Sequence, residues 1–264
     1  MKRFFVFLAL ITAFLAGCCS HHQSVAYPGI DYRDVPKRNL IKHLEDATLT
    51  LLQKDTEEGK YQMLCSGVWI TSTKFITARH CPENEIETFE NILFNTPVDL
   101  KKLPGVVMPY RTHAEMDQVF KIGANPKPHF ALVIGYDPNS DLALMETIDV
   151  VEHDIVPIYT GELFDGQDLH IVGHPSGLEY SYTPGVISSA ERNRSPFGEK
   201  WKLLQVTTSI WGGNSGGGAF DAAGSLVGIC SHQSTFNGAP INSLSYFVHR
   251  DVIVEFLKAE AVLF

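Results

Sequence analysis

A glycine-rich run that holds one serine is the part of the sequence best suited to chemistry. Residues 212–220 read Gly-Gly-Asn-Ser-Gly-Gly-Gly-Ala-Phe, with the serine at position 215. Glycines on both sides allow a tight turn, leave backbone N–H groups uncovered and let a substrate approach the hydroxyl closely. The N–H groups of Gly213 and Ser215 are candidate donors to the oxyanion of a tetrahedral intermediate, and losing one such donor costs about 100- to 1,000-fold in rate. A plain glycine-rich turn is the alternative; a phosphate-binding loop is excluded because no Lys-Ser or Lys-Thr follows the glycines.

A serine nucleophile needs a general base, and His80 is the candidate. It lies in Thr-Ala-Arg-His-Cys, at the end of an apolar stretch that we expect to be a strand. Imidazole titrates near neutral pH, so it can take the hydroxyl proton and later return it to a leaving group. The chain has 11 histidines, so His80 is singled out only by this context together with the serine motif downstream.

The third member of such a site is a buried carboxylate that holds the imidazole tautomer, and Asp141 is our candidate. It begins Asp-Leu-Ala-Leu-Met, where an acid meets an apolar strand at the edge of a core. Asp117 in a polar stretch and Asp137 in a turn are the rivals, and surface turns favour aspartate for structural reasons. The prediction is a triad of Ser215, His80 and Asp141.

Five cysteines divide into three groups. Cys65 and Cys81 flank a stretch that can fold back as a hairpin, so we expect a disulfide between them. Cys230 lies in an apolar run, where it is predicted to be a small buried hydrophobic residue rather than a nucleophile. Cys18 and Cys19 belong to the N-terminal segment. No metal site and no cofactor are predicted.

The N-terminal segment has the layout of a secretory signal peptide over residues 1–17. Lys2 and Arg3 precede an apolar run, 4–16, which is shorter than the roughly 20 residues that span a membrane. The run ends in Leu-Ala-Gly-Cys, which resembles a bacterial lipobox and implies lipidation of Cys18, with several acyl chains as a membrane anchor. Cys rather than Asp at position 19 resembles an outer-membrane address. An ordinary signal peptide with an incidental Cys18 is the alternative; either way we expect an exported protein, and with the anchor one that faces the periplasm or the cell exterior.

Composition describes an ordinary globular protein. Of 264 residues, 44% are hydrophobic and 19% charged, which is not the composition of a disordered chain. The net charge of −9 and the lack of a basic-aromatic cluster argue against nucleic acid as a partner.

Short apolar runs separated by turn residues predict an all-β protein after a polar tether at residues 18–38. The runs are 67–71, 74–77, 129–135, 142–147, 169–173, 185–188, 201–207, 226–230 and 245–248. Apolar residues four apart within about 250–260 predict an amphipathic C-terminal helix.

Four stretches together resemble the trypsin-like peptidases, and within them the HtrA (Deg) branch. They are 65–70 leading into 77–81, 133–144, 173–178 with 185–188, and 209–220. The resemblance implies two six-stranded antiparallel barrels within a protease domain at 39–264. The first, about 45–150, would carry His80 and Asp141; the second, about 155–249, would carry Ser215 across a cleft.

Three departures limit what the resemblance implies. HtrA-type enzymes usually carry a PDZ domain after the protease unit, and none is visible, so peptide-gated activation and chaperone-like assembly are not expected. Residues 82 to about 127 form an insertion between His80 and Asp141 whose role the sequence does not reveal. No Ile-Val-Gly-Gly-like site is visible, so zymogen processing is not expected.

The resemblance also implies which residues line the pocket for the substrate residue before the scissile bond, the P1 residue. They are Ser209, Ile210, Trp211, Cys230, Ser231 and His232. No carboxylate is among them to pair with Lys or Arg, and Cys230 stands where glutamate-cleaving relatives place a histidine. We therefore expect an apolar pocket for a small or medium aliphatic residue.

The expected function is that of a serine endopeptidase that cleaves protein or peptide substrates through an acyl-enzyme. A catalytically silent binding protein on the same scaffold is the alternative, since fold does not guarantee activity. An esterase of the α/β-hydrolase type is contradicted by the order His, Asp, Ser along the chain.

Overall fold

The computed structural model describes residues 37–54, 61–82, 106–108, 129–137, 139–147, 151, 153–178, 180–194 and 201–262. All of them belong to one compact unit. The predicted signal peptide at 1–17, Cys18, Cys19, the tether up to residue 36 and most of the insertion at 82–127 lie outside the described residues. Among the described helices, none combines the length and the apolarity that crossing a membrane requires.

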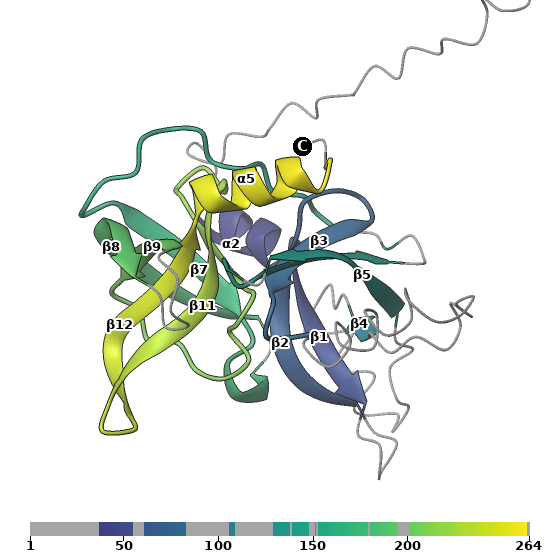
Figure 1. Ribbon diagram of the computed structural model, residues 1–264, viewed down its shortest axis with the longest axis horizontal. Coiled ribbons are helices and arrows are strands. Elements are labelled where there is room, and N and C mark those ends of the chain that lie inside the picture. The colour runs from purple at the N-terminus through teal and green to yellow at the C-terminus, as the bar shows by residue number, and fades with distance from the viewer. Residues whose placement is uncertain are drawn as a thin grey trace, which may run out of the picture. The chain divides into compact units, whose positions relative to one another are not determined.

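The first half of the unit is a closed six-stranded barrel (Figure 1). Its strands, in chain order, are β1 (Thr48–Lys54), β2 (Tyr61–Trp69), β3 (Lys74–Ala78), β4 (Val106–Met108), β5 (His129–Asp137) and β6 (Leu142–Thr147). Neighbours pair antiparallel in the spatial order β1-β2-β3-β6-β5-β4. The register places Ala78 at the end of β3 opposite Leu142 at the start of β6. His80 and Asp141, which lie just beyond these two ends, are thereby brought together.

The second half is another closed barrel of the same kind. Its strands are β7 (Asp168–Gly173), β8 (Ser181–Arg194), β9 (Trp201–Val206), β10 (Gly218–Phe220), β11 (Leu226–Phe236) and β12 (Ala239–His249). The spatial order β10-β11-β12-β9-β8-β7 closes through the antiparallel pair β7 and β10. Residues 212–217, here called the serine turn, lie directly before β10, so that strand fixes the C-terminal end of the serine turn.

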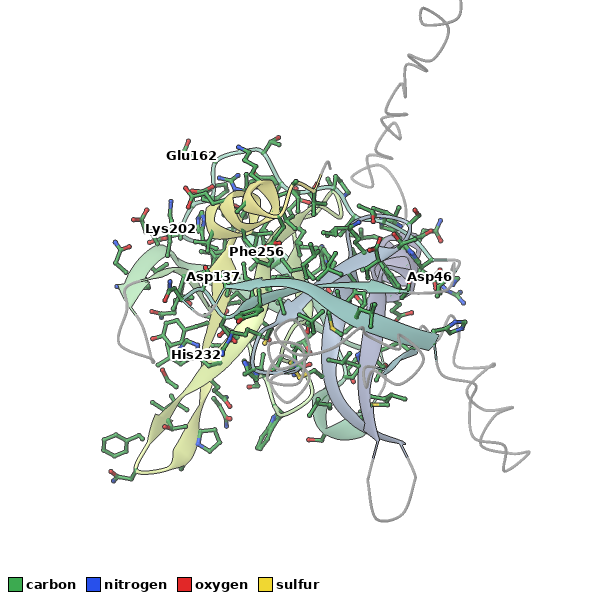
Figure 2. The ribbon with its side chains drawn as sticks, turned by 45° about the vertical axis from the view of Figure 1, so that its right-hand side comes forward. Asp46, Asp137, Glu162, Lys202, His232 and Phe256 are labelled. Atoms are coloured by element: carbon green, nitrogen blue, oxygen red, sulfur yellow. A yellow bond between two sulfur atoms is a disulfide. The ribbon has the colours of Figure 1, made fainter. Side chains whose placement is uncertain are left out.

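Two helices pack against the barrels. α2 (Lys37–Asp46) buries Leu40 and Leu44, and α5 (Arg250–Ala259) buries Ile253, Phe256 and Leu257. α5 contacts β6 of the first barrel as well as β9, β11 and β12 of the second, and Figure 2 shows Phe256 on the side of α5 that faces the strands. These side chains join Ile76, Leu144, Val172 and Phe220 in one apolar cluster, so burial of hydrophobic surface holds the two barrels together.

The predicted fold class is confirmed: the protein is all-β, with two six-stranded antiparallel barrels and a C-terminal helix. Each of the nine predicted runs overlaps a strand. The sequence did not predict β1, the three-residue strands β4 and β10, or α2, which begins at Lys37 where we expected a tether to residue 38. β4 lies within the insertion and β10 within the glycine-rich run, and each has only three residues, the short end of the usual range of strand lengths.

Candidate active site

His80 and Asp141 form a hydrogen-bonded pair at the end of the first barrel. The Nδ1 atom of His80 lies 3.0 Å from both carboxylate oxygens of Asp141, and the His80 backbone N–H donates to Oδ1 at 3.1 Å. Asp141 is 4% exposed. It has φ +56°, a left-handed conformation that aspartate tolerates better than most residues. A carboxylate can only accept, so Nδ1 carries the proton in this pair and Nε2 is left as the basic nitrogen.

The rival Asp137 has a structural role in the turn before Asp141. Its carboxylate accepts from Asn139 N–H at 2.9 Å and from Ser140 Oγ at 2.6 Å. These bonds shape the tight turn between β5 and β6, which is the ordinary reason for an aspartate there. The other rival, Asp117, lies outside the described residues.

Asp141 receives a further hydrogen bond from the second barrel. Ser231 in β11 is 4% exposed, and its Oγ donates to Asp141 Oδ2 at 2.6 Å. The strand is irregular here, with a shift in pairing between Cys230 and His232. Ser231, which we predicted as a pocket residue, thus directs its hydroxyl at Asp141.

The serine turn is held against the first barrel. The carbonyl of Ser215 accepts from the Ser66 N–H on β2 at 2.8 Å. The same oxygen lies 3.8 Å from the Sγ of Cys81, the residue after His80. A Cβ on Gly216 would collide with Thr77 Oγ1 and with the carbonyl of Ser66, so only glycine fits this approach. The turn that carries Ser215 therefore contacts Thr77 and Cys81, which come before and after His80 in the chain.

The backbone of the turn leaves two N–H groups available as donors. The carbonyl of Gly212 accepts from Ser176 N–H at 2.7 Å, and the carbonyl of Asn214 accepts from Gly217 N–H at 2.9 Å. In a trans peptide the C=O and the following N–H point in opposite directions, so the N–H groups of Gly213 and Ser215 point away from these contacts. Neither N–H has an acceptor within the part of the chain that the structure describes. Two N–H donors on either side of Asn214, without an acceptor among the described residues, are what stabilisation of an oxyanion requires.

The predicted disulfide between Cys65 and Cys81 is present, with its sulfurs 2.02 Å apart. It joins β2 to the residue after His80 and so restrains the segment that carries His80. Cys65, Cys81 and His80 bring ligand atoms within 4.8 Å of one another. Because the two sulfurs are bonded to each other, this group is a disulfide beside an imidazole.

The predicted pocket residues have different environments. Ile210 and Cys230 are 5% and 1% exposed and share one apolar cluster. Trp211 is 54% exposed and Ser209 is exposed as well, while His232 stacks on Tyr246 with ring centroids 4.9 Å apart. Burial, together with the charge of Asp141, raises the pKa of the Cys230 thiol. A buried thiol that stays protonated agrees with the prediction that Cys230 is a packing residue and not a nucleophile.

Sequence reasoning missed the importance of His174 and Ser66. His174 is fully buried, and burial lowers its pKa to about 3. Its Nδ1 lies 2.9 Å from Ser66 Oγ, and its ring meets that of Tyr180 edge-on with centroids 5.0 Å apart. The motif Gly-His-Pro-Ser-Gly contributed to the family resemblance, but nothing in it indicates a partner on a strand of the other barrel.

The fold and the site together define a class of protein: a double barrel in which a histidine–aspartate pair lies beside a serine turn. A model of the family described as trypsin-like peptidase domain matches residues 65–229. The chain belongs to this family, because the match covers more than half of it.

Related proteins are of the HtrA and Do-like type. The chain is 35% identical over 105 residues to "Protease Do-like 1, chloroplastic" of Arabidopsis thaliana, covering 38% of this chain and 24% of that protein. It is 32% identical over 150 residues to the "Probable periplasmic serine endoprotease DegP-like" of Hahella chejuensis, covering 55% and 30%. The match thus spans less than a third of the length of either relative.

Solved structures show the same fold. The "HtrA-type protease AlgW with tripeptide" aligns with a TM-score of 0.61 at 19% identity, over 84% of this chain and 62% of that one. An inactive mutant form of Rv3671c from M. tuberculosis aligns with a TM-score of 0.60 at 13% identity, over 85% and 91%. At these identities the likeness establishes the architecture.

Proposed function

We propose that the protein is a serine endopeptidase in which Ser215 is the nucleophile, His80 the general base and Asp141 the residue that orients the base. The observation that carries the proposal is the chain of contacts from Ser231 through Asp141 to His80, next to a serine turn with two free N–H donors. Activation of a serine hydroxyl requires these parts together.

The reaction proceeds in two acyl-transfer steps. Ser215 Oγ attacks the carbonyl carbon of the scissile peptide bond while its proton passes to His80 Nε2, since Nδ1 is committed to Asp141. The carbonyl oxygen, now negative, is bound by the N–H groups of Gly213 and Ser215. His80 then protonates the leaving amine, the C–N bond breaks and an acyl-enzyme remains. Water, deprotonated by His80, hydrolyses that ester and restores the serine.

The substrates are proteins or peptides, and the names of the HtrA and DegP-like relatives support this class. We propose an apolar P1 preference, for a small or medium aliphatic residue, because Ile210 and Cys230 are apolar and the six predicted pocket residues include no carboxylate. Cleavage of a peptide library measures this directly; a dominant preference for Lys, Arg or Glu would contradict it.

Export is proposed from the N-terminal layout, and the periplasmic relative supports it. The signal peptide at 1–17, the protease domain at 39–264 and the lipid at Cys18 remain proposals. Growth of an expressing bacterium with an alkyne-tagged fatty acid tests the anchor: the wild-type protein should carry the tag and Cys18→Ser should not. A tagged variant would mean that lipid is attached elsewhere, and an untagged wild type would mean an ordinary signal peptide.

A fluorophosphonate probe tests the activity, because it reacts covalently only with activated serines. The wild-type protein should be labelled and should hydrolyse casein, and Ser215→Ala should abolish both while keeping the thermal midpoint of unfolding. Ser72→Ala, which changes an exposed serine away from the site, is the matched control and should behave as the wild type. A folded wild-type protein without labelling or hydrolysis would instead favour the silent binding protein.

A further inference from the structure

Ser66 links the first barrel to the serine turn through a fully buried hydroxyl. It lies on β2 and is 0% exposed. Its Oγ donates to the carbonyl of Gly213 at 2.7 Å and accepts from the backbone N–H of His174 at 3.1 Å. The Nδ1 atom of His174 lies 2.9 Å from the same oxygen. One hydroxyl thus connects three segments that are far apart in the chain.

The hydrogen bonds of the Ser66 hydroxyl determine which ring nitrogen of His174 carries the proton. A carbonyl oxygen can only accept, so the single proton of the Ser66 hydroxyl goes to Gly213. The two remaining contacts of Oγ must then be bonds that it accepts, which requires a proton on His174 Nδ1. Nε2 carries the lone pair, and it is buried with no hydrogen-bond partner among the described residues. A second proton there would be unsolvated, in agreement with the lowered pKa of about 3.

Ser66 also holds the turn at a second point. Its backbone N–H donates to the carbonyl of Ser215 at 2.8 Å, so Ser66 binds the carbonyls on both sides of Asn214. The carbonyl before them, on Gly212, is held by Ser176 N–H at 2.7 Å. The Gly213 N–H lies in the same peptide plane as the Gly212 carbonyl that Ser176 holds. The plane that carries the Ser215 N–H lies between the two carbonyls that Ser66 holds, so fixing those carbonyls restrains its direction.

We propose that Ser66 and His174 form a buried clamp that positions the two oxyanion donors for catalysis. This inference rests on the proposed function and names the residues that hold its site in order. Neither side chain touches the reacting atoms, so both are positioning residues. His174 acts through Ser66: its Nδ1–H occupies the hydroxyl oxygen as an acceptor and leaves the hydroxyl proton aimed at Gly213.

Steady-state kinetics separate positioning from simple stability. Ser66→Ala removes the donor to Gly213 and should lower kcat about 10- to 100-fold while KM changes by less than about twofold, because donors to the oxyanion act mainly in the transition state. The affinity for a peptide aldehyde, whose serine adduct carries an oxyanion, should fall in parallel. The affinity for the matching peptide alcohol, which forms no adduct, should stay within about twofold.

Two further variants test the role of the imidazole. His174→Phe keeps the ring but has no donor for Ser66, and it should lose kcat as Ser66→Ala does. His174→Asn offers a side-chain N–H to the same hydroxyl and should retain more activity than His174→Phe. Thr48→Val is the matched control, because Thr48 is 1% exposed and its hydroxyl donates at 2.7 Å to the carbonyl of Leu44, away from Gly213 and His174. It should lose stability but keep kcat.

The outcomes separate the clamp from the function on which it rests. A wild-type protein that neither hydrolyses peptides nor takes the fluorophosphonate overturns the proposed function. An active wild type, with folded Ser66→Ala and His174→Phe proteins that keep both kcat and aldehyde affinity within about twofold, overturns the clamp alone. If Ser66→Ala does not fold, the two His174 variants test the clamp. Equal kcat values for His174→Asn and His174→Phe would contradict a role for the Nδ1 donor.

Discussion

Ser231 Oγ donates to Asp141 Oδ2 over 2.6 Å, which makes the acid of the first barrel dependent on a strand of the second. With the two donors of His80, the backbone N–H and Nδ1–H, this bond satisfies a carboxylate that is almost entirely buried. A buried charge needs such partners, because without them it is strongly destabilised. The orientation of His80 is therefore set jointly by both barrels.

Ser231→Ala should lower kcat/KM about tenfold, because a hydrogen bond to a charged group contributes roughly 1.5–3 kcal/mol and part of that is recovered by rearrangement. Peptide hydrolysis measures the effect, and Ser72→Ala serves as the control with an exposed serine. Unchanged kinetics in a folded Ser231→Ala protein would show that the bond has no influence on His80.

Asp141→Asn should lower kcat by a factor on the order of 10⁴ with little change in fold, as expected when an amide replaces the acid that holds the histidine tautomer. Asp137→Asn is the control from the same turn. It weakens bonds to Asn139 and Ser140, so it should cost about 1 kcal/mol of stability and leave kcat nearly unchanged. The reverse pattern would mean that Asp137 is the functional acid.

Gly213→Ala should cost about 100- to 1,000-fold in kcat, because the turn must distort and displace an oxyanion donor. Gly213 has φ +100°, and a Cβ there would collide with the carbonyl of His174. Gly212→Ala is the neighbouring control: a Cβ on Gly212 meets nothing within 4 Å, so its activity should stay within a few fold. Comparable losses in both variants would rule out this steric explanation.

Removing the disulfide with Cys65→Ala and Cys81→Ala together should lower the free energy of unfolding by about 3 kcal/mol, the entropic expectation for a loop closed across 16 residues. Urea unfolding of the variant and of the wild-type protein under reducing conditions should give the same decrease. A wild-type protein that is insensitive to reductant would contradict a stabilising role for the bond.

Acid should destabilise the fold through His249. This buried residue caps α5 by accepting the N–H of Asp251 at 3.0 Å. Burial lowers its pKa to about 4, with Lys202 and Arg250 acting in the same direction and Asp251 and Glu191 opposing them. A folded-state pKa below the unfolded value of 6.5 means that the stabilisation is complete above pH 6.5 and is lost as the pH falls through about 4.

Urea unfolding at a series of pH values measures this contribution. His249 should account for a loss of about 1 kcal/mol between pH 8 and pH 5.5. His249→Asn keeps an acceptor for the cap but does not titrate, so its stability should depend less on pH over this range. The pKa of His174 is lowered further, to about 3, so the fold also loses stability through His174 as the pH falls below 6.5, and the variant keeps that part of the pH dependence. An identical pH dependence in both proteins would exclude His249 as a source of acid sensitivity.

The sequence predicted those parts of the fold and the site that depend on the pattern of neighbouring residues. The strands around His80, Asp141 and Ser215 have apolar runs and turn residues that mark them, and the pairing of Cys65 with Cys81 follows from a hairpin. What it could not predict are bonds between residues that only the docking of the barrels brings together. Ser66 and His174 are 108 positions apart. Ser231 and Asp141 are 90 positions apart and belong to different barrels, and the pairing of β11 shifts at Ser231.

The bonds across the barrels also determine when the site can first exist. A growing polypeptide that has been synthesised as far as residue 200 already contains His80 and Asp141, but it lacks Ser215, both N–H donors and the hydroxyl of Ser231. For the proposed peptidase, the order of the parts along the chain thus delays hydrolytic capacity until residue 231 has been made and the two barrels have joined. The proposed triad would in this way be incomplete in an immature chain, which could not cut itself or its neighbours.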